Sequence, residues 1–291
     1  MADNIAVTVV IPTFNQASRL ELTLSSFLYQ EPSRGGWEVV VVDDGSTDDT
    51  SSIIEAFAGR LPLRSLRQPN SGRSAARNAG AAIARGRVLA FCDSDRVCAP
   101  SFVSAHAATA AADRDLLVSL GDVREVHVSD LDRRRAEILN DIDAGCPWLA
   151  RRSRRPAFVA ELHRYVIGPD GRAGISLAWL CFLSGNVSLS REAFEQAGGF
   201  DEDFVQWGFE HFELGYRLAS LGATFRYRPD ATNYHLAHRR GPGLYESGIE
   251  ASTVLLKRKH PQLPAETLAR WARGETTLPE VHATACRPES L

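Results

Sequence analysis

The first third of the chain alternates between two hydrophobic periods, and this alternation restricts the fold more than any other feature. Four apolar, β-branched runs are typical of strands buried on both faces of a parallel sheet: residues 5–11, 37–42, 63–66 and 88–92. Three amphipathic segments between them predict helices: residues 18–28, 48–58 and 74–84. The short connections predict right-handed βαβ units, and therefore an α/β fold whose mostly parallel sheet is flanked by helices.

Two of these helix starts are predicted from capping residues. Ser18 with Glu21 three positions later matches a capping box. Ser46 and Thr47 are the candidate caps of the second helix.

Polar residues directly follow three of the predicted strands: Pro12-Thr13, Asp43-Asp44 and Asp93-Ser94-Asp95. In open α/β sheets, ligands bind beyond the carboxyl ends of the strands. The three clusters are therefore predicted to meet at one edge of the sheet and to form a binding site there.

Each cluster has a chemical and a structural interpretation. Asp93 and Asp95 can share a hard divalent cation that bridges a diphosphate, or they can form a turn or a helix cap. Asp44 can accept hydrogen bonds from a ribose or a base, or belong to a turn. Arg73 and Arg77 follow a loop of Asn, Ser and Gly at a helix start, which favours phosphate binding; solvated surface arginines are the alternative.

Composition limits the partners and the compartment. The net charge of −3 gives no argument for binding to nucleic acid. Five cysteines lack metal-site spacing and are predicted to be mostly buried thiols in a reducing compartment: Cys92, Cys98, Cys146, Cys181 and Cys286. No signal peptide is predicted, and the apolar region 175–189 is too short and broken to span a bilayer. We therefore expect a cytoplasmic protein, either free or peripheral to a membrane.

Four ordered motifs together resemble the family 2 glycosyltransferases: Val9–Asn15, Val42–Asp48, Gly72 with Ala76–Asn78, and Phe91–Asp95. The second half resembles the family more loosely, through residues 198–202 and 207–214. The resemblance implies a GT-A fold, a nucleotide-sugar donor, a divalent metal (Mn²⁺ or Mg²⁺) and transfer with inversion in one displacement. A UDP-sugar is the default donor, while dTDP- and GDP-sugars stay open.

The resemblance also implies roles for individual residues. Thr13 and Asp44 would contact the nucleoside, Arg77 would lie near the donor, and Asp95 would ligate the metal beside Asp93. The whole donor-binding set is Pro12, Thr13, Asn15, Asp44, Gly72, Arg77, Asp93 and Ser94. The metal set is Asp95, Asp93 and His235, and His238 is the alternative histidine. The loop 239–243 is expected to close over the diphosphate.

The segment 207–214 resembles an acceptor-side motif in which an aspartate is the general base, but His211 occupies that position here. A histidine can act as a base near neutral pH, since its unperturbed pKa is ~6.5. His211 or its neighbour Glu210 is therefore the predicted base, unless His211 is a structural side chain. The predicted acceptor-binding residues are Trp207, Gly208, Glu213 and Asn186; Trp207 could equally belong to the core.

Three parts of the chain are expected: a nucleotide-sugar-binding subdomain at 1–115, an acceptor-binding and catalytic subdomain at 116–242, and a helical extension at 243–291. Two basic stretches in the second part, 133–135 and 151–155, are either solvated surfaces or a loop that grips acceptor or phosphate. The acceptor could be a glycan, a lipid-linked glycan, a peptide or a small molecule.

Other activities fit the sequence less well. A nucleotidyltransferase would need a Gly-rich, basic turn after the first strand, and a Rossmann dehydrogenase would need Gly-x-Gly-x-x-Gly there. Residues 12–15 offer neither pattern. A non-catalytic module that binds nucleotide or glycan stays open because of the histidine at position 211.

Overall fold

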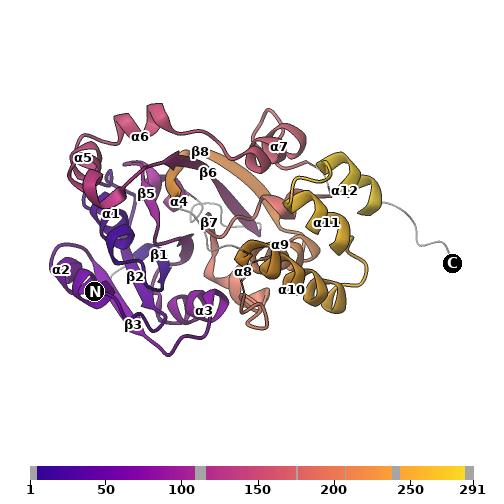
Figure 1. The fold of residues 1–291 in the computed structure, drawn as a ribbon, viewed down its shortest axis with the longest axis horizontal. Coiled ribbons are helices and arrows are strands. Elements are labelled where there is room, and N and C mark those ends of the chain that lie inside the picture. The colour runs from indigo at the N-terminus through magenta and orange to yellow at the C-terminus, as the bar shows by residue number, and fades with distance from the viewer. Residues whose placement is uncertain (1–4, 109–115, 175, 207, 238–242, 286–291) are drawn as a thin grey trace.

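The computed structural model describes residues 5–108, 116–174, 176–206, 208–237 and 243–285, which form one eight-stranded sheet covered by helices (Figure 1). The strands are β1 (Ile5–Thr13), β2 (Gly36–Asp43), β3 (Leu63–Arg67), β4 (Val88–Cys92), β5 (Arg96–Cys98), β6 (Leu117–His127), β7 (Asn186–Ser190) and β8 (Thr224–Ala237). The helices of the first half are α1 (Ala17–Phe27), α2 (Thr50–Ala58), α3 (Arg73–Ile83) and α4 (Phe102–Ala107). Those of the second half are α5 (Leu131–Asp143), α6 (Pro147–Arg152), α7 (Ala157–Val166), α8 (Arg191–Gln196), α9 (Glu210–Ser220), α10 (Leu244–Lys259), α11 (Ala265–Ala272) and α12 (Leu278–Ala285).

The strand order is β3-β2-β1-β4-β7-β6-β8-β5. The first four of these are mutually parallel, as the alternating pattern predicts, and the α/β class is confirmed. The second half is mixed, because β7 runs antiparallel to both β4 and β6, and β8 pairs parallel with β6 but antiparallel with β5. Because β5 pairs with β8, the sheet joins the first third of the chain to its second half. The three-part division remains a prediction.

Alternate residues of the central strands serve opposite faces of the sheet. Val9 and Ile11 of β1 share a buried cluster with Leu24 of α1, whereas Val10 points to the other face and contacts Gly80 of α3. Both faces of these strands are therefore buried, which explains their continuous apolar sequence. Figure 1 shows α1 and α2 at one end of the molecule and α10–α12 at the other, with the sheet between them.

Both predicted helix caps are wrong. No side-chain cap bond holds the start of α1; Glu21 instead forms an ion pair with Arg135 of α5. At α2, the carboxylate of Asp48 accepts a hydrogen bond from the backbone N–H of Thr50 at 3.1 Å. The hydroxyl of Ser46 is occupied by the backbone N–H of Asn15 at 2.9 Å, so it is not available to cap the helix.

No helix in the described part of the chain is both long enough and apolar enough to cross a bilayer.

The backbone at Gly86 lies against β1 so closely that a side chain cannot be added. A Cβ atom there would stand 2.4 Å from the backbone nitrogen of Thr8 and 2.6 Å from the carbonyl carbon of Val7. Strand backbone cannot move aside as a side chain can, because it is held by the hydrogen bonds of the sheet.

We predict that Gly86→Ala lowers the free energy of unfolding by about 2 kcal/mol or more, measured by urea denaturation. Gly59→Ala is the matched control, because no atom lies within 4 Å of a Cβ placed there and its φ of −93° suits alanine. The control should be neutral or slightly stabilising. Equal stability of the two variants would contradict the packing described for Gly86.

His106 of α4 is fully buried against β7, where its ring contacts the side chains of Asn186 and Ser188. Its Nε2 lies 3.0 Å from Asn186 Oδ1, and its Nδ1 lies 2.8 Å from Ser188 Oγ. An amide oxygen can only accept, so Nε2 carries a proton. Burial lowers the pKa of His106 to about 4, although the hydrogen bond to Asn186 acts in the opposite direction.

This pKa predicts a pH-dependent stability. The unfolded chain binds a proton at His106 below a pH of about 6.5 and the folded chain does so only near 4, so the stability contributed by neutral His106 is present above 6.5 and is lost as the pH falls toward 4. Between pH 7.5 and 5, the wild type should lose about 2 kcal/mol relative to His106→Gln, as measured by urea denaturation. A difference between the two proteins that does not change with pH would refute this assignment.

Candidate functional site

A cavity of about 640 Å³ opens where the parallel strands end. Thr13, Asp44, Asp93 and Asp95 all line it, so the predicted convergence of the three polar clusters is confirmed. Pro12, Gly72, Arg77 and Ser94 of the predicted donor set also line the cavity.

Asp44 fixes the loop that precedes α3. Its Oδ1 accepts hydrogen bonds from Gln68 Nε2 at 2.8 Å and from the backbone N–H of Ser71 at 2.9 Å. Its Oδ2 accepts from the backbone N–H of Gly72 at 2.9 Å. Gly72 has a φ of +90°, a left-handed conformation that glycine adopts without strain. The buried carboxylate therefore shapes the wall of the cavity.

Thr13 presents a polar atom that the fold itself does not satisfy. The residue is buried, and none of the described residues forms a hydrogen bond with its Oγ1. Buried polar groups are normally hydrogen-bonded, so an unpaired hydroxyl in a cavity wall is a candidate contact for a ligand.

Arg77 connects two acidic residues of the cavity, Asp93 and Glu210. Its guanidinium is almost fully buried, with Nη2 2.9 Å from Asp93 Oδ1 and Nη1 3.2 Å from Glu210 Oε1. Arg96 contacts the other oxygen of Asp93 at 3.3 Å. Burial raises the pKa of Asp93, but the charges of Arg77 and Arg96 outweigh it, so the pKa is lowered. Asp93 is therefore a carboxylate held between two arginines.

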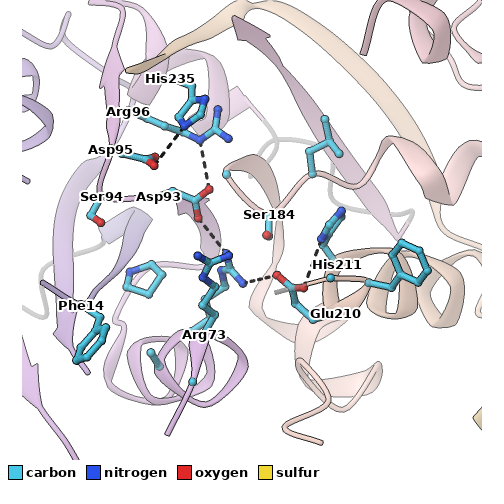
Figure 2. Close-up of a pocket in the computed structure, with 18 of the residues that line it drawn as sticks. Phe14, Arg73, Asp93, Ser94, Asp95, Arg96, Ser184, Glu210, His211 and His235 are labelled. Atoms are coloured by element: carbon cyan, nitrogen blue, oxygen red, sulfur yellow. Dashed lines mark hydrogen bonds and ion pairs between the residues drawn. The ribbon is translucent and has the colours of Figure 1, made fainter. Parts of the chain in front are cut away.

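Asp95 and His235 lie close together, with Oδ2 and Nε2 3.3 Å apart, as Figure 2 shows. The antiparallel pairing of β5 with β8 causes this, because Arg96 is opposite His235. Glu125 of β6 lies on the other side of the imidazole, with Oε1 3.9 Å from Nδ1. In the described ranges, no three His, Cys, Asp or Glu residues are arranged as a complete metal site.

Glu210 and His211 begin α9 at the cavity wall. Glu210 is buried; its Oε1 contacts Arg77 and its Oε2 lies 3.7 Å from His211 Nδ1. Burial raises the pKa of Glu210, but the neighbouring His211, Arg77 and Arg73 lower it to about 2. Glu210 is therefore an anion throughout the neutral range and a weak base.

Two predicted acceptor-binding residues, Glu213 and Asn186, do not line the cavity. Glu213 is buried, with its carboxylate 2.6 Å from Arg217 and 2.9 Å from His260. The side chain of Asn186 is held by His106 and donates to the carbonyl oxygen of Ala231 at 2.9 Å. Their positions do not support the acceptor-binding roles, because both side chains are held by other residues of the protein outside the cavity lining.

Asn15 of the predicted donor set also lies outside the cavity lining. Its side-chain oxygen accepts from the backbone N–H of Thr47 at 2.8 Å, and its φ of 51° places it in a left-handed turn. Asn15 therefore shapes the turn after β1 and does not contact the cavity.

Some predicted site residues fall in gaps between the described ranges. Trp207, His238 and the loop residues 239–242 lie outside the described residues. Gly208 is described and lines the cavity, and a Cβ there would stand 1.8 Å from Ser252 Oγ.

The basic stretches have structural partners. Arg134 lies over the ring of Trp148, and Arg155 contacts Asp122 at 2.8 Å. None of the arginines in the two stretches is among the described residues that line the cavity. This favours the interpretation as solvated and structural surfaces.

Several residues that line the cavity were not predicted from the sequence. Arg96 could have been predicted, because it directly follows the acidic triplet Asp93-Ser94-Asp95. Glu125, Ser184 and Phe158 carry no motif, and only the pairing of distant elements brings them to the cavity.

Comparison with known proteins places this geometry in a family. The family model described as "Glycosyl transferase family 2" matches residues 8–175, and the model described as "N-terminal domain of galactosyltransferase" matches residues 172–239. A validoxylamine A glucosyltransferase of Streptomyces hygroscopicus subsp. jinggangensis is 33% identical over 280 residues, which cover 91% of this chain and 63% of that protein. The hyaluronan synthase of Pasteurella multocida is 28% identical over 241 residues, covering 80% of this chain and 24% of that protein.

Solved structures agree on the fold. The structure of S. aureus TarS 1-349 is similar with a TM-score of 0.59 and 19% identity, covering 87% of this chain and 66% of that one. The mannosyltransferase PcManGT from Pyrobaculum calidifontis, in complex with GDP-Man and Mn²⁺, has a TM-score of 0.56 and 20% identity, covering 96% and 72%.

This chain spans about three fifths of the validoxylamine A glucosyltransferase. More than half of the chain matches the family model, and its neighbours in structure share the GT-A arrangement of the sheet. The chain belongs to glycosyl transferase family 2 and has the GT-A fold.

Proposed function

We propose that this protein transfers a sugar from a nucleoside-diphosphate sugar to an acceptor hydroxyl, with inversion and with the assistance of a divalent metal. The observation that supports the proposal is the contact of Arg77 with both Asp93 and Glu210, because it joins the predicted donor end to the start of α9, where both candidate bases line the same cavity. UDP-sugars are the first candidates for the donor. A solved neighbour, S. aureus TarS 1-349, was obtained in complex with UDP-GlcNAc.

The part of the cavity near β1 and α3, called the donor end, carries side chains suited to the base and the phosphates of a nucleotide. Phe14 is 45% exposed at the cavity and presents an apolar face suited to a base. Thr13 Oγ1 is available for a polar contact. Arg73 and Arg77 line the cavity from α3, and arginine is suited to phosphate oxygens.

The residues present fit a divalent cation at Asp95 and His235. Their oxygen and nitrogen atoms face each other at 3.3 Å in the cavity wall, and carboxylate with imidazole suits Mn²⁺. Asp93 is a weaker candidate than predicted, because both its oxygens contact arginines. When bound, the cation would offset the negative charge of the departing nucleoside diphosphate.

His211 is the better candidate for the base. Nδ1 of His211 faces the anionic Glu210 at 3.7 Å, and in this proposal its Nε2 accepts the proton of the acceptor hydroxyl. The acceptor oxygen then bonds to the anomeric carbon as the bond to the diphosphate breaks. Glu210 stabilises the resulting imidazolium and holds the ring in position, while His211, Arg77 and Arg73 together keep Glu210 ionised.

The acceptor class varies among relatives. Their names include a validoxylamine A glucosyltransferase, a hyaluronan synthase and a polypeptide N-acetylgalactosaminyltransferase. Small molecules, glycans, lipid-linked glycans and peptides are therefore all in the proposed range, and nucleic acid is not. In this proposal residues 1–115 bind the donor, and residues 116–242 carry the base and acceptor side.

Two substitutions separate metal binding from catalysis. With Mn²⁺ and a panel of UDP-, GDP- and dTDP-sugars, we expect nucleotide to raise the melting temperature of the wild type and nucleoside diphosphate to be released slowly. Asp95→Ala should abolish the Mn²⁺-dependent part of the shift. His211→Ala should keep the shift while turnover falls at least ~100-fold, because general-base catalysis typically contributes that much.

Asp170→Ala and His282→Ala are the matched controls, because both side chains lie outside the cavity lining. Full activity of His211→Ala would eliminate it as the base. Nucleotide binding without turnover in the wild type would instead support a non-catalytic module, and no binding across the panel would reject the proposed function.

A further inference from the structure

The cavity has a second end that the donor, metal and base residues leave unused. It lies where α7, α10 and α11 meet, and its lining there is Pro156, Phe158, Tyr245, Trp271 and Ala272. Among the described lining residues, the charged side chains come only from the strands, the turns that follow them, α3 and α9. In its described residues, this end is therefore aromatic and uncharged.

Aromatic rings connect this end to the predicted base. The ring centroid of Phe212 lies 4.1 Å from that of His211 and 6.2 Å from that of Trp271. The ring of Phe158 follows, 6.3 Å from Trp271 and nearly perpendicular to it. The aromatic end thus begins beside His211 and extends away from the acidic and basic residues of the donor end.

Phe158 supplies the accessible surface. Its side chain is 41% exposed although it lines the cavity, whereas Trp271 and Phe212 are buried behind it. An exposed aromatic ring inside a concave site is a surface that a ligand can cover.

Hydrogen bonds hold the helices of this end together. Trp271 Nε1 donates to Glu161 Oε2 at 2.8 Å, which joins α11 to α7. The backbone N–H of Leu278 donates to Glu161 Oε1 at 2.8 Å, and Tyr245 Oη donates to the carbonyl oxygen of Ala272 at 2.6 Å. The surface is therefore formed before a ligand arrives, which reduces the entropic cost of binding.

We propose that this aromatic end is the acceptor subsite and that it takes a neutral, ring-shaped polyol, such as an uncharged sugar or cyclitol. The C–H face of such a ring packs on Phe158 while a hydroxyl reaches His211. Acids and phosphate esters are disfavoured, because their charge would lose water without gaining a charged partner among the described residues of this end. The assignment rests on the proposed function, since it names the acceptor of the same transfer.

Saturation-transfer NMR on the full chain with UDP and Mn²⁺ tests this subsite, because the method detects weak ligands. The neutral probes are cellobiose and myo-inositol, and the charged probes are glucuronic acid and glucose 6-phosphate. We expect saturation of the ring protons of the neutral probes only. Phe158→Ala should weaken their binding about fivefold, and Phe158→Tyr should restore it.

Tyr165→Ala is the matched control, because Tyr165 is a similarly exposed aromatic residue of α7 that contacts His282 outside the cavity lining. It should leave binding of the neutral probes unchanged. Equal saturation of charged and neutral probes, or no effect of Phe158→Ala, overturns the subsite. If the wild type still shows a UDP-dependent thermal shift, only the acceptor assignment fails; if that shift is absent, the proposed function itself fails.

Discussion

The site depends on the ion pairs that the buried guanidinium of Arg77 forms with two carboxylates. The Arg77 side chain is 2% exposed and contacts one carboxylate from the first third of the chain, Asp93 after β4, and one from the second half, Glu210 at the start of α9. Removing one partner of a buried ion pair costs about 3–5 kcal/mol, because the remaining charge is left without compensation. Here the loss of Arg77 would remove a cationic partner from both carboxylates, leaving Asp93 beside Arg96 and Glu210 beside His211. Arg77 therefore fixes the separation between the predicted donor end and the predicted base.

The fold explains how residues far apart in sequence reach one cavity. The parallel strands β1, β2 and β4 bring Thr13, Asp44 and Asp93 to one edge. The antiparallel insertion of β7 then turns the chain, and β8 returns to pair with β5, which sets His235 beside Asp95. Gly185 allows this junction to close, since a Cβ there would stand 2.4 Å from Arg96 Nε and 2.5 Å from Asp93 Oδ2.

The first half of the fold was predictable from the sequence, because strand burial and helix periodicity are local patterns. Strand 88–92 is recovered with its bounds unchanged, and the acidic triplet after it lines the cavity as expected. The roles of Glu213 and Asn186 could not be read this way. Glu213 is held by Arg217 and His260, and Asn186 is held by His106. These contacts depend on tertiary packing, which no local sequence pattern predicts. A motif gives a position, whereas the direction of a side chain depends on its tertiary neighbours.

The choice between Glu210 and His211 as the base also depends on tertiary contacts that the motif does not give. Both residues stand in one motif, and only the contact with Arg77 distinguishes a fixed anion from a candidate base. The most direct test of the account is the anomeric configuration of the first product, followed by proton NMR during slow hydrolysis of a UDP-α-sugar with Mn²⁺. A single displacement predicts that the β-anomer appears first and then equilibrates. Initial release of the α-anomer would contradict the account.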